Sequence, residues 1–229
     1  MARLALASVL VPLVLAAPAA PPADHTRVVR ETIEWLDVWV PGNNVTDLPS
    51  VLLVGDSITR DYYKAVEDKL QGKAVVCRLS TSKSLGDPAL LDEVRLVLGQ
   101  AKFDVVHFNN GMHGWGYTED EYAKAIPELV AAIRKAAPGV KLVWASTTPV
   151  RVARQVDQLD PKTDRVKARN AAAAEVMKRE KIPVNDLFTF VAEKPEWFSN
   201  DGVHLNAKGS AALSEQVAAH VLKVLGGAK

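Results

Sequence analysis

The chain has 229 residues, 48% of them hydrophobic, and its 28 Lys and Arg nearly balance its 27 Asp and Glu. This length fits one domain with a sizeable core, and the balanced charge gives no reason to expect nucleic acid or a basic protein as a partner. Cys77 is the only cysteine, which excludes an internal disulfide, and no Cys/His spacing indicates a structural zinc site.

Residues 1–19 have the layout of a secretory signal peptide. An arginine precedes an apolar stretch over residues 4–15, and small residues follow at Ala17-Pro18-Ala19. The stretch is shorter than the roughly 20 residues that cross a bilayer, so we expect cleavage rather than a membrane anchor. The sequence therefore predicts an exported protein, periplasmic or extracellular, with no stable membrane insertion after cleavage.

Residues 20–49 form a lead-in segment rich in Pro and Asn, with one amphipathic piece over residues 28–40 that we expect to pack on the domain. In the domain itself, residues 50–229, short apolar runs alternate with longer amphipathic stretches, as in βαβ units. The predicted strands are 51–54, 74–77, 104–108, 140–145 and 182–184. The predicted helices are 58–70, 88–100, 118–137, 164–181 and 207–225.

The composition of these elements predicts the fold class. Continuous apolar strands indicate a sheet that is covered on both faces. We therefore expect an α/β protein, a three-layer α/β/α sandwich with a central, mostly parallel five-stranded sheet. Thr118 and Glu121, three residues apart, predict a capping box at the start of the third helix.

Ser57 follows the first predicted strand in the turn Gly55-Asp56-Ser57. Ligands of open parallel sheets bind beyond the carboxyl ends of the strands, and a serine at a helix N-terminus has backbone N–H groups beside it that can stabilise an oxyanion. The alternative is that Ser57 only caps the helix.

Asp201 lies three residues before His204, just ahead of the last predicted helix. A serine nucleophile needs an imidazole base, and the imidazole needs an acceptor that fixes its tautomer. Ser57, His204 and Asp201 supply these three groups. The alternative is an ordinary loop with a capping aspartate.

These two motifs, in this order, resemble the first and fifth sequence blocks of the SGNH (GDSL-type) hydrolases. The resemblance spans residue 51 to the C-terminus. It implies a flavodoxin-like α/β/α fold and cleavage of esters, often acyl groups on carbohydrates or lipids, by a serine and a histidine with no metal and no cofactor.

The resemblance also implies donors to an oxyanion. The Ser57 N–H is the first, and Gly86 is the counterpart of the second-block glycine, although Gly86 also fits a plain turn before a helix. The third block departs from the usual Gly-x-Asn-Asp, because this chain has Asn109-Asn110-Gly111-Met112-His113. Aligning the glycines favours His113, but an amide that is a neutral donor at every working pH makes Asn110 the preferred candidate. We interpret this Asn-x-Gly-x-His block as the mark of a subfamily.

Three further side chains near strand ends are candidates for substrate binding. Trp115 and Tyr117 could form a platform for a sugar ring or an acyl group, and Arg151 could contact an acidic sugar. The alternatives are core or rim packing for the aromatic residues and a solvated surface for the arginine.

The leading hypothesis is an exported serine esterase that hydrolyses small O-acyl esters, with acetyl as the expected acyl group and a small molecule or carbohydrate as its carrier. Two alternatives are a carbohydrate O-acyltransferase of the same fold and a non-catalytic carbohydrate-binding protein on a lapsed hydrolase fold. Metal-assisted hydrolysis lacks a recognisable ligand spacing. Nothing in the sequence indicates the oligomeric state.

Overall fold

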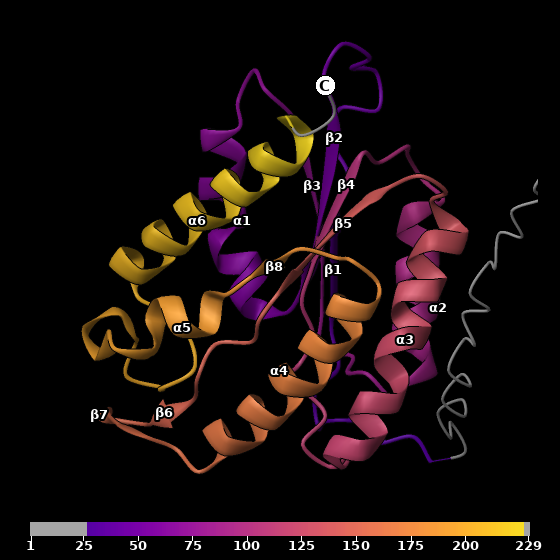
Figure 1. Cartoon of the computed structure of the whole chain (residues 1–229). Helices are drawn as coiled ribbons and strands as arrows, with labels where there is room; N and C mark the ends of the chain where they lie inside the picture. Colours follow the sequence, from indigo (N-terminus) through magenta and orange to yellow (C-terminus); the bar gives the residue numbers. More distant parts are fainter. Residues whose placement is uncertain (1–26, 227–229) are drawn as a thin grey trace, which may run out of the picture.

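The computed structural model describes residues 27–226, and its centre is a six-stranded sheet with the order β1-β3-β2-β4-β5-β8 (Figure 1). Five of the strands are parallel. They are β2 (Ser50–Gly55), β3 (Val75–Thr81), β4 (Val105–Phe108), β5 (Lys141–Ala145) and β8 (Val184–Asn185).

Helices cover both faces of this sheet, which confirms the predicted three-layer α/β/α sandwich. Alternate residues of each strand point to opposite faces, so Val51 and Leu53 of β2 enter one buried cluster and Leu52 and Val54 enter the other. The first cluster packs against α1 (Ser57–Lys69) and α6 (Ala207–Gly226). The second packs against α2 (Pro88–Leu98), α3 (Glu119–Ala136) and α4 (Lys162–Arg179).

The predicted number of strands was wrong, because the lead-in segment contributes a sixth. Strand β1 (Leu36–Trp39) pairs antiparallel with β3 at the edge of the sheet. Its ends are exposed, Leu36 by 44% and Trp39 by 57%, so no clear alternation of buried and solvated residues marks it as a strand.

Three small elements between the predicted ones were also missed. A hairpin of β6 (Arg151–Val152) and β7 (Gln155–Leu159) precedes α4. The short helix α5 (Leu187–Ala192) and the 3₁₀ turn Pro195–Trp197 follow β8. The predicted capping box of α3 is present, since Thr118 and Glu121 exchange side-chain and backbone hydrogen bonds.

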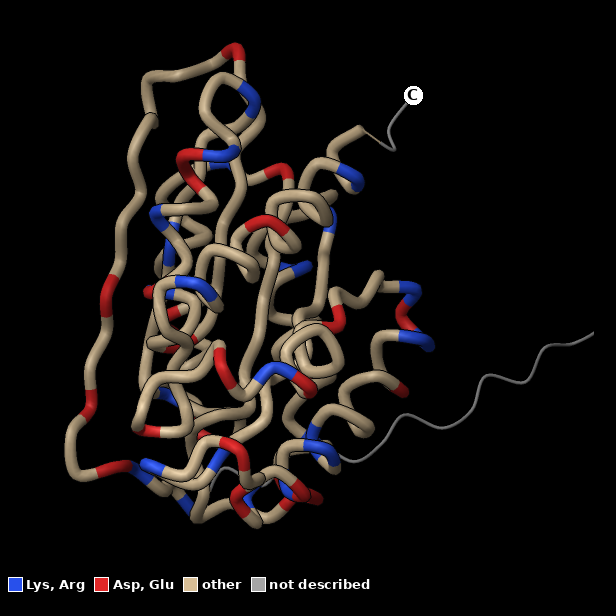
Figure 2. Tube along the Cα trace, turned by 90° about the vertical axis from the view of Figure 1, so that its left-hand side faces the viewer, with Lys and Arg blue, Asp and Glu red and all other residues tan. Residues whose placement is uncertain are grey.

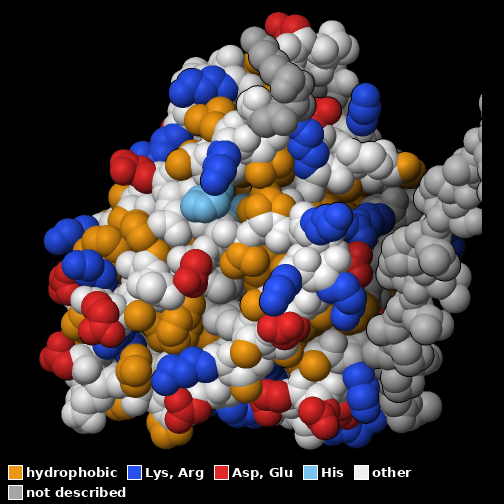
Figure 3. Space-filling view, in the orientation of Figure 1, with side chains coloured by type: hydrophobic (Ala, Val, Ile, Leu, Met, Phe, Trp, Pro, Cys, Tyr) orange, Lys and Arg blue, Asp and Glu red, His pale blue; other side chains and the backbone are white. Residues whose placement is uncertain are grey.

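The signal peptide predicted for residues 1–19 lies outside the described residues. Within residues 27–226, no helix combines the length and the apolar character needed to cross a bilayer. Acidic and basic residues are interspersed along the trace (Figure 2), and charged side chains are scattered among hydrophobic ones on the face seen in Figure 3.

Candidate active site

Ser57 is the first residue of α1 and stands directly beyond the carboxyl end of β2. The turn is tight, because a Cβ at Gly55 would lie 2.0 Å from Oγ1 of Thr59. The N-cap is Asp56, whose carboxylate accepts the N–H of Ile58 at 2.9 Å. Ser57 is therefore not the capping residue, and its hydroxyl is left for other partners.

The hydroxyl of Ser57 is 2.7 Å from Nε2 of His204, and Nδ1 of His204 is 2.7 Å from Oδ2 of Asp201. Because a carboxylate only accepts, the proton of the neutral imidazole is on Nδ1. Nε2 then carries the lone pair and accepts from the Ser57 hydroxyl. The structure thus brings together three side chains that the sequence separates by up to 147 positions.

The carboxylate of Asp201 is held in place through its other oxygen. Oδ1 accepts the hydroxyl of Ser199 at 2.8 Å and the N–H groups of Val203 and His204 at 2.8 and 2.9 Å. Partial burial by itself would raise the pKa of Asp201, but these bonds and the one from His204 outweigh it and hold the pKa well below its usual range. Asp201 is therefore charged at any working pH.

The β6–β7 hairpin supports the loop that carries Asp201. The N–H groups of Arg151 and Arg154 donate at 2.7 Å to the carbonyls of Gly202 and Asn200. Gly202 has a φ of +78°, and a Cβ there would lie 2.1 Å from the carbonyl oxygen of Arg151. Only glycine allows the hairpin and the loop to approach this closely.

A pocket of about 460 Å³ opens beside Ser57 and His204. Met112, His113 and Trp115 of the loop after β4 form one wall. The lining also includes Val150, Lys162 and Val203, and residues 29–32 of the lead-in segment. The pocket is large enough for a group of monosaccharide size.

The two candidates for the third oxyanion donor occupy different places. The Asn110 amide accepts the N–H of Leu85 at 3.0 Å and donates to the carbonyl of Lys83 at 2.9 Å, so it joins two loops. Asn110 does not line the pocket, whereas His113 does. Nδ1 of His113 lies 2.9 Å from Oε1 of Glu31.

Gly86 follows the loop that Asn110 fixes. Its φ is +103°, and a Cβ there would lie 2.9 Å from the ring of Tyr117. Glycine is therefore required at this position on steric grounds alone. The expectation that its N–H stabilises an oxyanion stays a prediction.

Of the substrate-binding candidates, only Trp115 lines the pocket. Tyr117 is 2% exposed, and its hydroxyl accepts the N–H of Val29 at 2.8 Å. Arg151 is also buried, and its guanidinium donates to the carbonyls of Val156 and Ala192. We therefore correct the interpretation of Tyr117 and Arg151: both tie segments of the fold together. A position after a strand does not reveal which way a side chain points.

His107 is fully buried in β4, where Nδ2 of Asn185 donates to its Nε2 at 3.1 Å. Burial, and to a smaller extent the nearby His220, lowers the pKa of His107 to about 3. It is a neutral core histidine. Among the described residues, no three His, Cys, Asp or Glu side chains are grouped as metal ligands.

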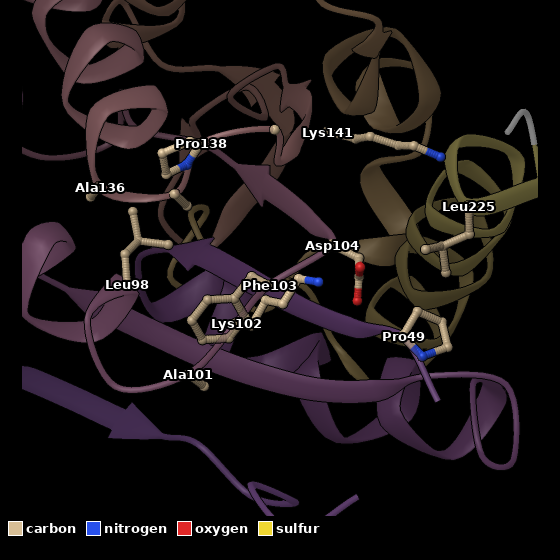
Figure 4. Close-up of a pocket in the computed structure, with 12 residues that line it drawn as sticks. Pro49, Leu98, Ala101, Lys102, Phe103, Asp104, Ala136, Pro138, Lys141 and Leu225 are labelled. Atoms are coloured by element: carbon tan, nitrogen blue, oxygen red, sulfur yellow. The ribbon is translucent and has the colours of Figure 1, made fainter. Parts of the chain in front are cut away.

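A second hollow, of about 640 Å³, lies at the other end of the sheet (Figure 4). Pro49, Asp104 and Lys141, at the amino ends of the strands, contribute to it. Asp104 accepts the N–H of Ser50, and Lys141 donates to the carbonyl of Val224. Its charged groups thus hold the backbone, and no nucleophile with a base accompanies them.

Two groups at the site were missed in the sequence. The first is Glu31, which reaches His113 across 82 positions. The second is a pair of arginines in α4. Arg169 is 1% exposed and donates to the carbonyls of Gly111, His113 and Gly114. Arg165 donates to the carbonyls of Trp115 and Tyr117. A buried arginine on a polar helix gives no local signal of its partners.

Comparison with known proteins gives the family and the fold. The model of the GDSL-like lipase/acylhydrolase family matches residues 53–212. A carbohydrate esterase family 3 protein from Talaromyces cellulolyticus has a similar structure, with a TM-score of 0.64 and 19% identity over 79% of this chain and 100% of that chain.

Two further solved structures share the fold. A GDSL-like lipase from Bacteroides thetaiotaomicron has a TM-score of 0.62 and 16% identity, over 79% of this chain and 94% of that chain. The acetyl xylan esterase AlAXEase has a TM-score of 0.60 and 17% identity, over 75% and 99% of the two chains. Among curated proteins, none matches the chain.

Proposed function

Because the chain belongs to the GDSL-like lipase/acylhydrolase family, we propose that it is a serine esterase that hydrolyses small O-acyl esters. The observation that carries the proposal is the pair of 2.7 Å hydrogen bonds that links Ser57 to His204 and His204 to Asp201. This arrangement supplies a nucleophile, a base and an acceptor that orients the base.

In the proposed reaction, Oγ of Ser57 attacks the acyl carbon while its proton passes to Nε2 of His204. Asp201 keeps the Nδ1 proton in place and stabilises the imidazolium. The N–H of Ser57, at the positive end of α1, stabilises the oxyanion. His204 then protonates the leaving alcohol, and water, deprotonated in turn by His204, releases the acid and restores Ser57.

We propose acetyl as the acyl group and a carbohydrate as the alcohol. The pocket of about 460 Å³ has room for a sugar ring, and Trp115 offers an aromatic surface in its wall. An acetyl xylan esterase and a carbohydrate esterase have the same fold, which makes this substrate class the first to test. We also propose export, which predicts that protein recovered from the periplasm or the medium begins after Ala19.

The test is hydrolysis of p-nitrophenyl acetate and of acetylated mono- and oligosaccharides by wild type and Ser57→Ala. We expect the variant to lose at least about 10⁴-fold in kcat. Its melting temperature should stay unchanged because Asp56 caps α1. Ser210→Ala, a serine of α6 outside the pocket, is the control. Near-normal turnover by Ser57→Ala would contradict the mechanism, and transfer of acetyl to added sugar would show an acyltransferase.

A further inference from the structure

Residues 27–35, here called the strap, precede the family-matched region and lie across the carboxyl ends of the strands. In Figure 1 the strap is the indigo segment that passes below the sheet, near the first turn of α3. Arg27 contacts Glu121 at 3.1 Å and the carbonyl of Gly116 at 2.8 Å. At the other end, the N–H of Trp35 donates to Oγ of Ser82 at 2.9 Å.

The middle of the strap is anchored by a buried group. Nε of Arg30 donates to Oδ2 of Asp87 at 3.0 Å, and the Asp87 side chain is 1% exposed. The Arg30 side chain is 54% exposed, so solvent partly screens this ion pair, but the buried carboxylate keeps a charge-assisted bond to the strap. This anchor fixes the position of the next residue, Glu31.

Glu31 points its carboxylate at the loop after β4. Oε1 lies 2.9 Å from Nδ1 of His113 and 3.4 Å from the N–H of Gly114. The ring of Trp35 meets the imidazole edge to face, at 6.1 Å between centroids, and Arg169 holds the carbonyl of His113 at 2.8 Å. The strap thus contacts the imidazole, and α4 holds the backbone of the same residue.

The hydrogen bond to Glu31 determines which ring nitrogen of His113 carries the proton. A carboxylate only accepts, so Nδ1 carries a proton and Nε2 is left as the second nitrogen. Nε2 is buried and has no hydrogen-bond partner among the described residues. His113 lines the same pocket as Ser57 and His204, so a bound ester lies beside this ring.

We propose that Glu31 is a positioning residue of the esterase site, which holds the imidazole of His113 in the pocket wall through the hydrogen bond to Nδ1. This inference rests on the proposed function. It extends the site beyond the family-matched residues to the strap. The third block differs from the usual family pattern by having His113. Glu31 is the hydrogen-bond acceptor for this histidine.

The test is a double-mutant cycle with p-nitrophenyl acetate at one pH. We expect His113→Ala to lower kcat by about 10²-fold, the scale of a misplaced substrate, because the imidazole forms part of the pocket wall beside Ser57. Glu31→Ala should lower kcat about 10-fold with KM changed less than about 2-fold, and the double variant should match His113→Ala, because Glu31 acts through His113. Glu31→Gln, whose amide oxygen can still accept from Nδ1, should restore most of kcat.

Arg27→Ala is the matched control, because it removes contacts of the strap to Glu121 and to the carbonyl of Gly116 but leaves the contact of Glu31 with His113 in place, and its kcat should stay within about 2-fold of wild type. In ¹⁵N spectra, Nδ1 of His113 should be protonated in wild type and lose that preference in Glu31→Ala. An unchanged kcat in Glu31→Ala or His113→Ala, or losses that multiply in the double variant, would overturn the inference. Activity that survives Ser57→Ala would instead refute the proposed function.

Discussion

Replacement of Asp201 by asparagine tests the geometry of the site most directly. Asparagine has the same shape, but one of its two terminal atoms is a donor. Oδ1 of Asp201 accepts three hydrogen bonds, from Ser199, Val203 and His204, whereas Oδ2 faces Nδ1 of His204 alone. The amide oxygen of the variant should therefore take the place of Oδ1, which directs its NH₂ group at Nδ1.

The size of this preference follows from the bonds at stake. The opposite orientation would put NH₂ against two backbone N–H groups and lose at least two bonds of about 1 kcal/mol each. A difference of about 2–3 kcal/mol leaves the productive tautomer in roughly one molecule in 30 to 150. The other molecules carry the proton on Nε2, which then cannot accept from Ser57.

The loss of the negative charge adds to this effect, because the imidazolium formed during the reaction is no longer stabilised. We expect kcat to fall by about 10⁴-fold, as in other Ser-His-Asp hydrolases. The assay is initial-rate hydrolysis of p-nitrophenyl acetate, with circular dichroism to verify the fold. Asp157→Asn, an exposed aspartate of β7, is the matched control. If Asp201→Asn keeps more than about a tenth of wild-type kcat, the tautomer argument is wrong.

Two predictions concern pH. Asp201 should stay charged throughout the acid limb of kcat/KM, because its pKa is held well below its usual range, and an infrared signal of a protonated Asp201 carboxyl within that limb would contradict this. In the folded protein the pKa of His107 is lowered to about 3, so the side chain stays neutral above that pH. In the unfolded chain the same histidine takes up a proton below about pH 6.5. The free energy of unfolding therefore decreases as the pH falls from about 6.5 toward 3. His107→Gln should flatten the free energy of unfolding between pH 6 and 4 by about 1.4 kcal/mol per pH unit, measured by urea denaturation; an unchanged slope would refute this.

The sequence predicts the parallel sheet well because β2, β3, β4 and β5 each contain a run of buried apolar residues. It predicts the three residues of the proposed triad because each follows a strand or precedes a helix. Strand β1 was not predicted, because it forms by pairing with residues 78–81 of β3 and its own hydrophobic pattern does not mark it as a strand. The β6–β7 hairpin was not predicted either, because its turn has Arg154 at a φ of 64°, where glycine or asparagine is usual.

The walls of the pocket were the least predictable part of the site. Tyr117 lies in a loop and Arg151 begins the short strand β6, positions that suggested exposure, yet both side chains are buried by contacts with other segments. Glu31 lies in a segment without regular structure, and its partner His113 is 82 positions away. Such pairings depend on the assembled fold and leave no local pattern.

The strap also bears on the order in which the chain is made. A ribosome synthesises residues 27–35 before any of their partners, and Glu121 emerges 94 positions after Arg27. At about 5–20 residues per second this is an interval of roughly 5–20 seconds. The strap therefore makes its contacts only after the βα units that follow it in the chain have formed. One part of the pocket lining is thus completed after the sheet. A wall installed in this way can change its residues between relatives without altering how the sheet assembles.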